Sequence, residues 1–159
     1  MATETLNIDS ATSQASFTVK KLGLITVKGT LKDFSGSINF DEKDLSNSSF
    51  ETSLAVSTIN TGTPKRDEHL KSADFFAADT YPEISFRSTA IENIGGKYQA
   101  TGQLTIQDLS KEVIIPFDFK NGTFKGAFSL NRLDYNLGKK FPTFFIGNNI
   151  EIAITCKVK

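Results

Sequence analysis

The chain has 159 residues, which is long enough for one domain with a substantial core. Its 18 lysines and arginines balance 18 aspartates and glutamates, and this zero net charge argues against a nucleic-acid partner, which normally requires a basic excess. Tryptophan is absent while there are 14 phenylalanines, so phenylalanine rings dominate any apolar interior. We predict a single domain over residues 1–159, with no membrane span, because no apolar run approaches roughly 20 residues.

The N-terminal residues indicate in which cellular compartment the protein is expected. Met1–Glu4 have neither the basic nor the apolar region of a signal peptide. We therefore expect a cytoplasmic protein, or a periplasmic one if a leader has been removed. The weak alternation of Glu4–Asp9 then predicts a first strand.

The next part of the chain alternates between apolar and polar side chains, the pattern of half-buried strands. Phe50–Val56 is a long run of this kind, with a clean apolar side and a clean polar side. Strands are predicted around the apolar positions Phe17 and Val19, Ile25 to Leu31, Ile38 and Phe40, and Phe50 to Val56.

The segment Thr61–Phe76 breaks this alternation. Thr63 suits a helix N-cap and Pro64 suits the first helical position, where its missing N–H costs nothing. The sequence therefore predicts a short helical insert near residues 63–76. Such an insert in an all-β chain usually covers an open end of the β structure.

Three interpretations of the polar residues in this insert stay open. Arg66, Asp67 and His69 form a hydrogen-bonded knot that fixes the turn, or they contact the polar head group of a ligand. Alternatively His69 and Asp67 form a general-base pair. Residues at i and i+2 do not face each other on a helix, and no nucleophile motif lies nearby. We therefore expect no enzymatic activity and no catalytic residue.

After the insert the chain has the pattern of successive hairpins. The dipeptide Asn121-Gly122, between two alternating runs, predicts a type I′ turn. Strands are predicted at Ile84–Ser88, Tyr98–Ile106, Val113–Phe119, Phe124–Leu130 and Ile150–Val158.

Arg132 and Asp134 lie near the end of a predicted strand. They either pair with each other as an ordinary surface ion pair, the interpretation that we favour, or contact a polar head group. The single Cys156 falls on the apolar side of the last strand, which indicates a buried, unreactive thiol.

The long predicted loop Leu137–Gly147 carries three aromatic residues. Phe141, Phe144 and Phe145 form either an apolar mouth or lid, or a plug that packs one end of the β structure.

About nine or ten short strands joined by tight turns predict a sandwich or a barrel. Polar outward faces and the need to remove exposed edges favour the barrel. A barrel of about eight strands either holds one small ligand or is filled by its own side chains.

Several segments together resemble the YceI-like family of lipocalin-like, polyisoprenoid-binding proteins. They are Ser16–Asp41, Arg66–Leu70, Asp74–Phe76, Tyr81–Ser88, Gly102–Ile106, Lys111–Val113, Asn131–Tyr135 and Gly147–Ile152. The resemblance implies an all-β fold, an extended antiparallel eight-stranded lipocalin-like barrel. It also implies a long isoprenoid, isoprenoid quinone or similar lipid held inside. No cofactor or metal is required, and a homodimer is expected.

Alternation and family position together nominate the residues that line the barrel. They are Phe17, Val19, Phe40, Leu54, Val56, Phe76, Phe86, Leu104, Phe117, Phe128 and Ile152. Head-group or structural roles fall to Arg66, Asp67, His69, Arg132 and Asp134.

Three functions follow from the sequence. The first is sequestration or carriage of a long-chain apolar ligand, in transport, storage or stress protection. The second is a packed, non-binding barrel that acts through protein contacts. The third is a lipid-modifying enzyme that uses His69 and Asp67.

Overall fold

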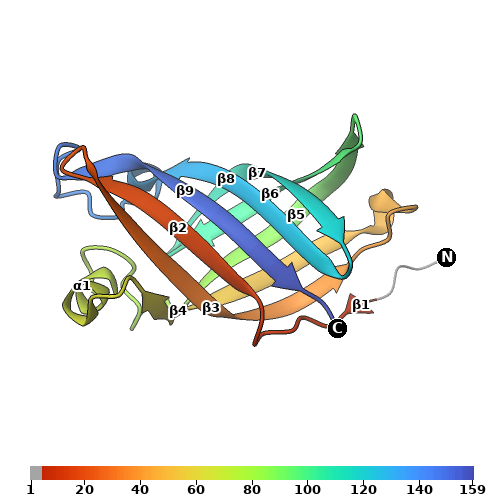
Figure 1. Cartoon of the computed structure of the whole chain (residues 1–159), viewed down its shortest axis with the longest axis horizontal. Helices are drawn as coiled ribbons and strands as arrows, with labels where there is room; N and C mark the ends of the chain where they lie inside the picture. The colour runs from red at the N-terminus through yellow and green to blue at the C-terminus, as the bar shows by residue number, and fades with distance from the viewer. Residues whose placement is uncertain (1–4) are drawn as a thin grey trace.

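The computed structural model describes residues 5–159, so Met1–Glu4, with the predicted start of the first strand, lie outside the described residues. The chain forms an elongated antiparallel β-barrel (Figure 1), which confirms the predicted all-β fold. Its strands are β1 (Thr5–Leu6), β2 (Gln14–Lys21), β3 (Ile25–Asn39), β4 (Ser49–Asn60), β5 (Glu83–Ile94), β6 (Lys97–Ile106), β7 (Leu109–Lys120), β8 (Thr123–Asn131) and β9 (Ile146–Lys157). Its helices are α1 (Pro64–Leu70) and the 3₁₀ turns η1 (Leu45–Asn47) and η2 (Arg132–Tyr135).

The barrel closes through pairing of β3 with β4. The order in the sheet is β1-β3-β2-β9-β8-β7-β6-β5-β4, and the additional β3–β4 pairing joins its two sides. Strands β2 to β9 thus form the closed barrel, while β1 adds only a short pairing with the end of β3, at Thr5↔Asn39 and Leu6↔Ile38. Closure leaves none of these eight strands with a long open edge.

The hairpin turns follow from local residue chemistry. Asn121 and Gly122 have φ angles of 52° and 74°, and Lys120 pairs with Thr123 across them. Two positive φ values in a two-residue loop are the geometry that Asn-Gly favours, so the predicted turn is confirmed. The predicted helix also forms, with Pro64 at its start and Thr63 at its N-cap, although Thr63 makes no side-chain capping hydrogen bond.

Several strands extend beyond their predicted ends, β9 and β4 among them. β9 begins at Ile146 and not at Ile150, because Ile146 pairs with Lys21 and Asn149 pairs with Asn131. Backbone pairing to two neighbours therefore extends the strand through a polar segment that shows no alternation. β4 continues to Asn60, and its register against β3 shifts near Lys32.

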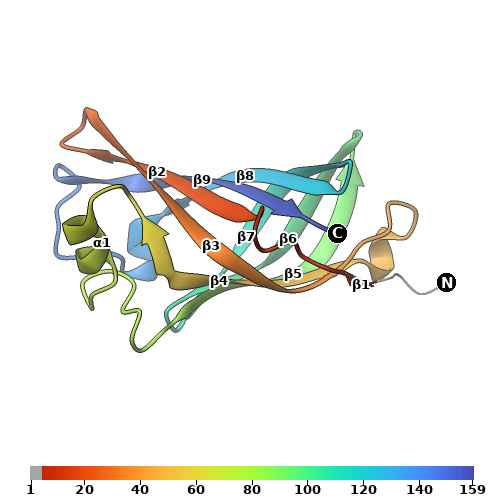
Figure 2. The same cartoon turned by 60° about the horizontal axis from the view of Figure 1, so that its bottom comes forward.

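The two ends of the barrel differ in construction (Figures 1 and 2). At one end lie α1, the β2–β3 hairpin and the loop that precedes β9. At the other end the interior is filled by an aromatic plug, which consists of Phe40, Phe50, Tyr98, Phe117, Phe119 and Phe124. The Phe40 ring is central in this plug, with its centroid 5.2 Å from those of Phe119 and Phe124. Such edge-to-face ring pairs add to the stabilisation from burial.

Candidate functional site

A cavity of about 880 Å³ occupies the barrel between the aromatic plug and the α1 end. Every strand of the closed barrel contributes to its wall, through residues that include Phe17, Leu31, Leu54, Phe86, Leu104, Phe117, Phe128 and Ile152. The volume lies in the upper part of the range of about 300–1,000 Å³ typical of ligand sites. The interior is therefore open, and the wall offers hydrocarbon and few hydrogen-bonding groups.

The structure places most of the predicted lining residues on this wall. The residues that line the cavity are Phe17, Val19, Leu54, Phe76, Phe86, Leu104, Phe117, Phe128 and Ile152. The prediction is wrong for Phe40 and Val56, which do not contact the cavity. Phe40 directly follows β3 and lies within the aromatic plug. Val56, 1 % exposed, follows the register shift at Lys32↔Ala55, where simple alternation along β4 no longer applies.

The three aromatic residues of the long loop take three different positions. Phe141 lines the cavity and stacks on Phe75, with ring centroids 5.6 Å apart. Phe145 lines the mouth and is half exposed, whereas Phe144 is not part of the wall and projects outward. The loop therefore surrounds the α1 end of the cavity without filling it.

Arg66 and Asp67 both bind Thr61, the residue that follows β4. The Asp67 carboxylate accepts hydrogen bonds from the Thr61 N–H at 2.9 Å and from its hydroxyl at 2.6 Å. Arg66 donates from Nε to the Thr61 hydroxyl and from Nη2 to the Thr61 carbonyl, both at 2.8 Å. These bonds fix the start of α1 against the barrel, and Arg66 also faces the cavity.

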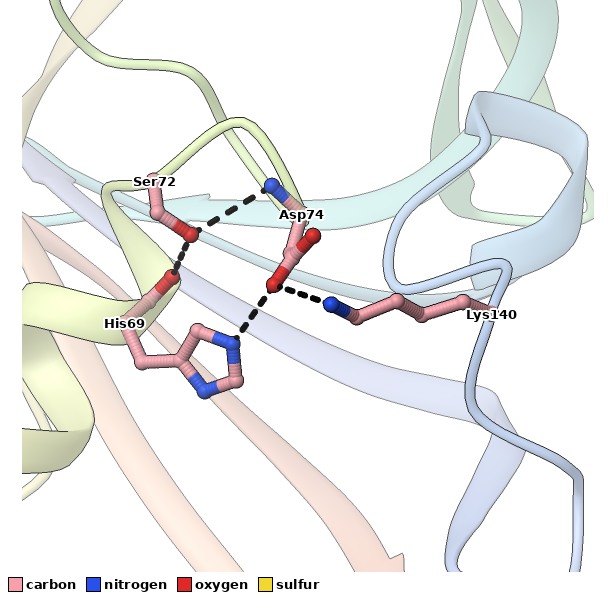
Figure 3. A network of polar contacts seen from close by, with 4 residues as sticks. All are labelled: His69, Ser72, Asp74 and Lys140. Atoms are coloured by element: carbon pink, nitrogen blue, oxygen red, sulfur yellow. Dashed lines mark hydrogen bonds and ion pairs between the residues drawn. The ribbon is translucent and has the colours of Figure 1, made fainter.

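His69 does not pair with Asp67. Its Nε2 lies 2.9 Å from Oδ2 of Asp74, and Lys140 Nζ donates to the same oxygen at 2.9 Å (Figure 3). The Ser72 hydroxyl donates to the His69 carbonyl at 2.6 Å and accepts from the Asp74 N–H at 3.3 Å. This network connects α1 to the loop before β9, so the predicted knot exists in part, with Asp74 as the partner of His69.

The hydrogen bonds from His69 and then Lys140 hold the pKa of Asp74 below its ordinary value of 3.8. A depressed carboxyl pKa stabilises the fold above the unfolded pKa, and this contribution is lost as the pH falls through the folded pKa. We therefore expect Asp74→Asn to lower the melting temperature near neutral pH, and to do so less and less as the pH falls below 3.8.

Thermal unfolding followed by circular dichroism across this pH range measures the effect. Asp118→Asn is the matched control, because Asp118 is exposed on β7. A constant difference between the wild-type and Asp74→Asn curves at all pH values would contradict a structural role for the Asp74 carboxylate.

Arg132 is not part of a surface ion pair with Asp134, so that prediction is wrong. It is 2 % exposed, and its five N–H groups donate to five backbone carbonyls. Nε donates to Gly147 at 3.2 Å, and Nη1 donates to Leu137 at 3.0 Å and to Gly138 at 2.7 Å. Nη2 donates to Phe141 at 2.8 Å and to Ile146 at 3.1 Å. The guanidinium therefore organises the whole loop before β9.

Burial lowers the pKa of the Arg132 guanidinium, which nevertheless keeps its charge because an arginine is not deprotonated in proteins. Tyr135 packs beneath the same loop, and its hydroxyl donates to the Leu104 carbonyl at 3.2 Å. Burial, followed by the nearby charge of Asp134, raises the pKa of Tyr135 to about 12.

The charged side chains that line the cavity are all basic. They are Lys20, Lys21, Lys65, Arg66 and Arg132, with His69 beside them, and no aspartate or glutamate of residues 5–159 lines the wall. These residues belong to β2, α1 and η2. We call this set the basic rim. It creates a local positive potential in a chain of zero net charge.

The described residues show no group of three metal-ligating side chains that would hold an ion. Cys156 lines the cavity wall, and burial raises the pKa of its thiol to about 11. Within residues 5–159, no helix has both the length and the apolar character needed to cross a lipid bilayer. What the arrangement can do chemically is bind an apolar chain and attract a negative or polar group at its mouth.

Several residues of the α1 end cannot be recognised from the sequence. Lys20 and Lys65 give no signal, because lone lysines are ordinary on strand and helix surfaces. Asp74 stands out only as part of a family motif. Its position five residues after His69 is too distant for a regular helical pair, and it meets the imidazole because the chain turns back after Leu70.

The chain matches the YceI-like domain family over residues 6–158. A UPF0312 protein of Photorhabdus laumondii is 37 % identical over 99 residues, which are 62 % of this chain and 52 % of that protein. This chain thus aligns with about half the length of that relative.

Solved structures share the architecture. Burkholderia cenocepacia BcnA superposes with a TM-score of 0.86 at 27 % identity, covering 94 % of this chain and 98 % of that one. A polyisoprenoid-binding domain from Saccharophagus degradans superposes with a TM-score of 0.75 at 12 % identity, covering 99 % and 98 % of the two chains.

Proposed function

The chain belongs to the YceI-like family, and we propose from its cavity that it binds one long-chain apolar ligand inside the barrel and carries or sequesters it. The observation that supports this is the open cavity of about 880 Å³ with a wall of aromatic and aliphatic side chains. Removing several hundred Å² of hydrocarbon from water at roughly 25 cal/mol per Å² supplies on the order of 10 kcal/mol before the entropic costs of binding.

The position of the basic rim suggests how such a ligand lies. The apolar end reaches toward the aromatic plug, and the polar end stays at the mouth near Lys21 and Lys65. Arg132 is less suited to contact a head group, because backbone carbonyls occupy all of its donors. A single-chain lipid with a polar or acidic head fits this arrangement.

Isoprenoids are the first ligands to test. The Saccharophagus domain with the same fold is described as polyisoprenoid-binding, and an isoprenoid quinone or polyprenyl chain presents the hydrocarbon that this wall accommodates. The proposal includes no catalytic step, since Asp67 binds Thr61 and not His69. A homodimer is not needed for binding, because one chain supplies the whole wall.

Affinity is expected to depend on the length of the apolar chain. Each added methylene removes further area from water, so the dissociation constant should fall about fourfold per methylene, which corresponds to about 0.8 kcal/mol. The gain should stop once the chain outgrows the cavity, because further carbons remain in water. Displacement of a fluorescent fatty acid by a series of straight-chain acids measures this. An affinity independent of chain length would contradict burial of the apolar chain in the cavity.

A further inference from the structure

Two loop tips at the α1 end expose apolar side chains to solvent. The first is the tip of the β2–β3 hairpin, with Leu22, Leu24 and Ile25, and the second carries Phe144 and Phe145 before β9. These are five of the eight large hydrophobic residues that are exposed within residues 5–159. Leu24 is 87 % exposed and Phe144 is 71 % exposed. Single exposed hydrophobic residues are ordinary on a protein surface, but a cluster of them indicates an interaction site.

The two tips form one surface, which we call the apolar tip patch. The Leu22 N–H donates to the Phe145 carbonyl at 3.1 Å, and Lys21 pairs with Ile146 in the sheet. Figures 1 and 2 show the two loops side by side at the same end of the barrel. Leu22 has a φ of 55°, a backbone region that leucine adopts only at a cost. The two loop tips are therefore fixed to each other by backbone contacts and do not form two independent loops.

The charges around the patch are of one sign. The stretches 19–28 and 137–149 contain five lysines and neither aspartate nor glutamate. Lys20, Lys21 and Lys139 are exposed, whereas Lys140 is already paired with Asp74. Leucine and aromatic side chains flanked by lysines are typical of surfaces that enter the head-group region of a bilayer.

The patch is also continuous with the cavity. Leu22, Phe145 and Ile146 line the cavity mouth, and so do Lys20 and Lys21. A membrane in contact with the patch would therefore lie directly against the opening of the barrel. The chain would then exchange an apolar ligand with the bilayer without passing it through water.

We propose that the apolar tip patch docks the protein on the surface of an anionic lipid bilayer, with the cavity mouth facing the lipid. A second copy of the chain fits the patch less well. A symmetric dimer contact places the same surface on both sides, so it would bring two sets of lysines, Lys20, Lys21 and Lys139 of each copy, close together. A bilayer with acidic head groups instead complements these lysines. Docking needs only the outer surface, so it does not depend on what occupies the cavity.

Flotation with lipid vesicles tests the proposal. We expect the full chain to float with vesicles of phosphatidylcholine and phosphatidylglycerol, and less with phosphatidylcholine alone. The double variant Leu24→Asp/Phe144→Asp should reduce the bound fraction at least about tenfold, because two inserted apolar groups become charged. Neither residue lines the cavity, so binding of a detergent-delivered ligand should be unchanged.

Matched controls come from exposed apolar residues elsewhere. Ile94, at the β5–β6 hairpin, is 56 % exposed and lies at the opposite end of the barrel, and Ile114 on β7 is 51 % exposed. Ile94→Asp/Ile114→Asp should float like the wild type. Lys139→Glu, at an exposed lysine that does not line the cavity, should weaken binding to the anionic vesicles and leave binding to phosphatidylcholine vesicles unchanged.

Four results would overturn the proposal. The first is a wild-type chain that stays in solution with both kinds of vesicle. The second is a tip variant that floats as well as the wild type. The third is a dimer, detected by light scattering, that Leu24→Asp/Phe144→Asp dissociates, since the patch would then be an interface between copies. Vesicle binding that disappears when the cavity is blocked by Ile152→Trp would assign the binding to ligand uptake and equally reject docking.

Discussion

Replacing Ile152 with tryptophan is expected to lower the affinity for a long-chain ligand by at least about 100-fold. Ile152 lies at the middle of β9, paired with Phe17 on one side and Phe128 on the other, and all three side chains line the cavity. An indole at this position occupies the path along which the chain extends toward the aromatic plug. Losing roughly 120 Å² of buried hydrocarbon costs about 3 kcal/mol, which corresponds to about 100-fold.

The same substitution should not destabilise the protein. It adds volume to an open cavity and not to a close-packed core, so we expect the free energy of unfolding to change by less than about 1 kcal/mol. The comparison of binding with stability therefore separates a blocked site from a misfolded barrel.

Ala153→Trp is the matched control for Ile152→Trp. Ala153 is the next residue on β9, and it is exposed on the outer face of the barrel. Its replacement introduces the same indole on the opposite side of the strand and should leave affinity unchanged. Equal affinity of Ile152→Trp and Ala153→Trp would contradict binding in the cavity.

Replacing Arg132 with methionine is expected to lower the free energy of unfolding by about 3–5 kcal/mol. The variant keeps much of the apolar stem but leaves the carbonyls of five residues without their donor. Leaving buried carbonyl oxygens without their charged donor costs free energy, because few other donors in the surroundings can take its place. Denaturant unfolding of the full chain measures the loss.

Two further variants serve as controls for Arg132→Met. Arg87→Met removes an exposed arginine on β5 and should change stability by no more than about 0.5 kcal/mol. Arg132→Lys keeps the charge but has three donors on one atom. Its free energy of unfolding should therefore lie between those of the wild type and Arg132→Met. If Arg132→Met were as stable as Arg87→Met, the guanidinium would not be what organises the loop before β9.

The sequence predicted those parts of the fold that local chemistry specifies. Alternation in β2, β8 and β9 identified Phe17, Phe128 and Ile152 as interior residues, and Asn121-Gly122 identified a turn. Pro64 marked the start of α1. Each of these signals depends only on residues close together in the chain.

Features that depend on contacts between distant segments were not predictable in this way. The shift between β3 and β4 follows from their pairing, so Val56 could not be placed by alternation alone. Arg132 has the local sequence of a surface residue, and its burial results from a loop that returns over it five to fifteen residues later. Whether the barrel was open or filled depended on the packing of side chains from all of its strands.

The structure gives the two ends of the barrel separate roles. The aromatic plug closes one end with interlocking rings, while Arg132 and the His69–Asp74–Lys140 network hold the segments around the other end in place. When a binding site is preorganised in this way, little binding free energy is lost in ordering its loops. The segments around the cavity mouth are therefore held in fixed positions, and the mouth is bordered by the basic rim and the apolar tip patch.

Native mass spectrometry of the freshly purified protein, with solvent extraction of anything bound, tests the central claim most directly. Binding of a long-chain ligand predicts a stoichiometric adduct that extracts as a lipid and that is absent from Ile152→Trp but present in Ala153→Trp. A bare mass that persists after incubation with isoprenoid quinones and fatty amides would contradict the proposed function.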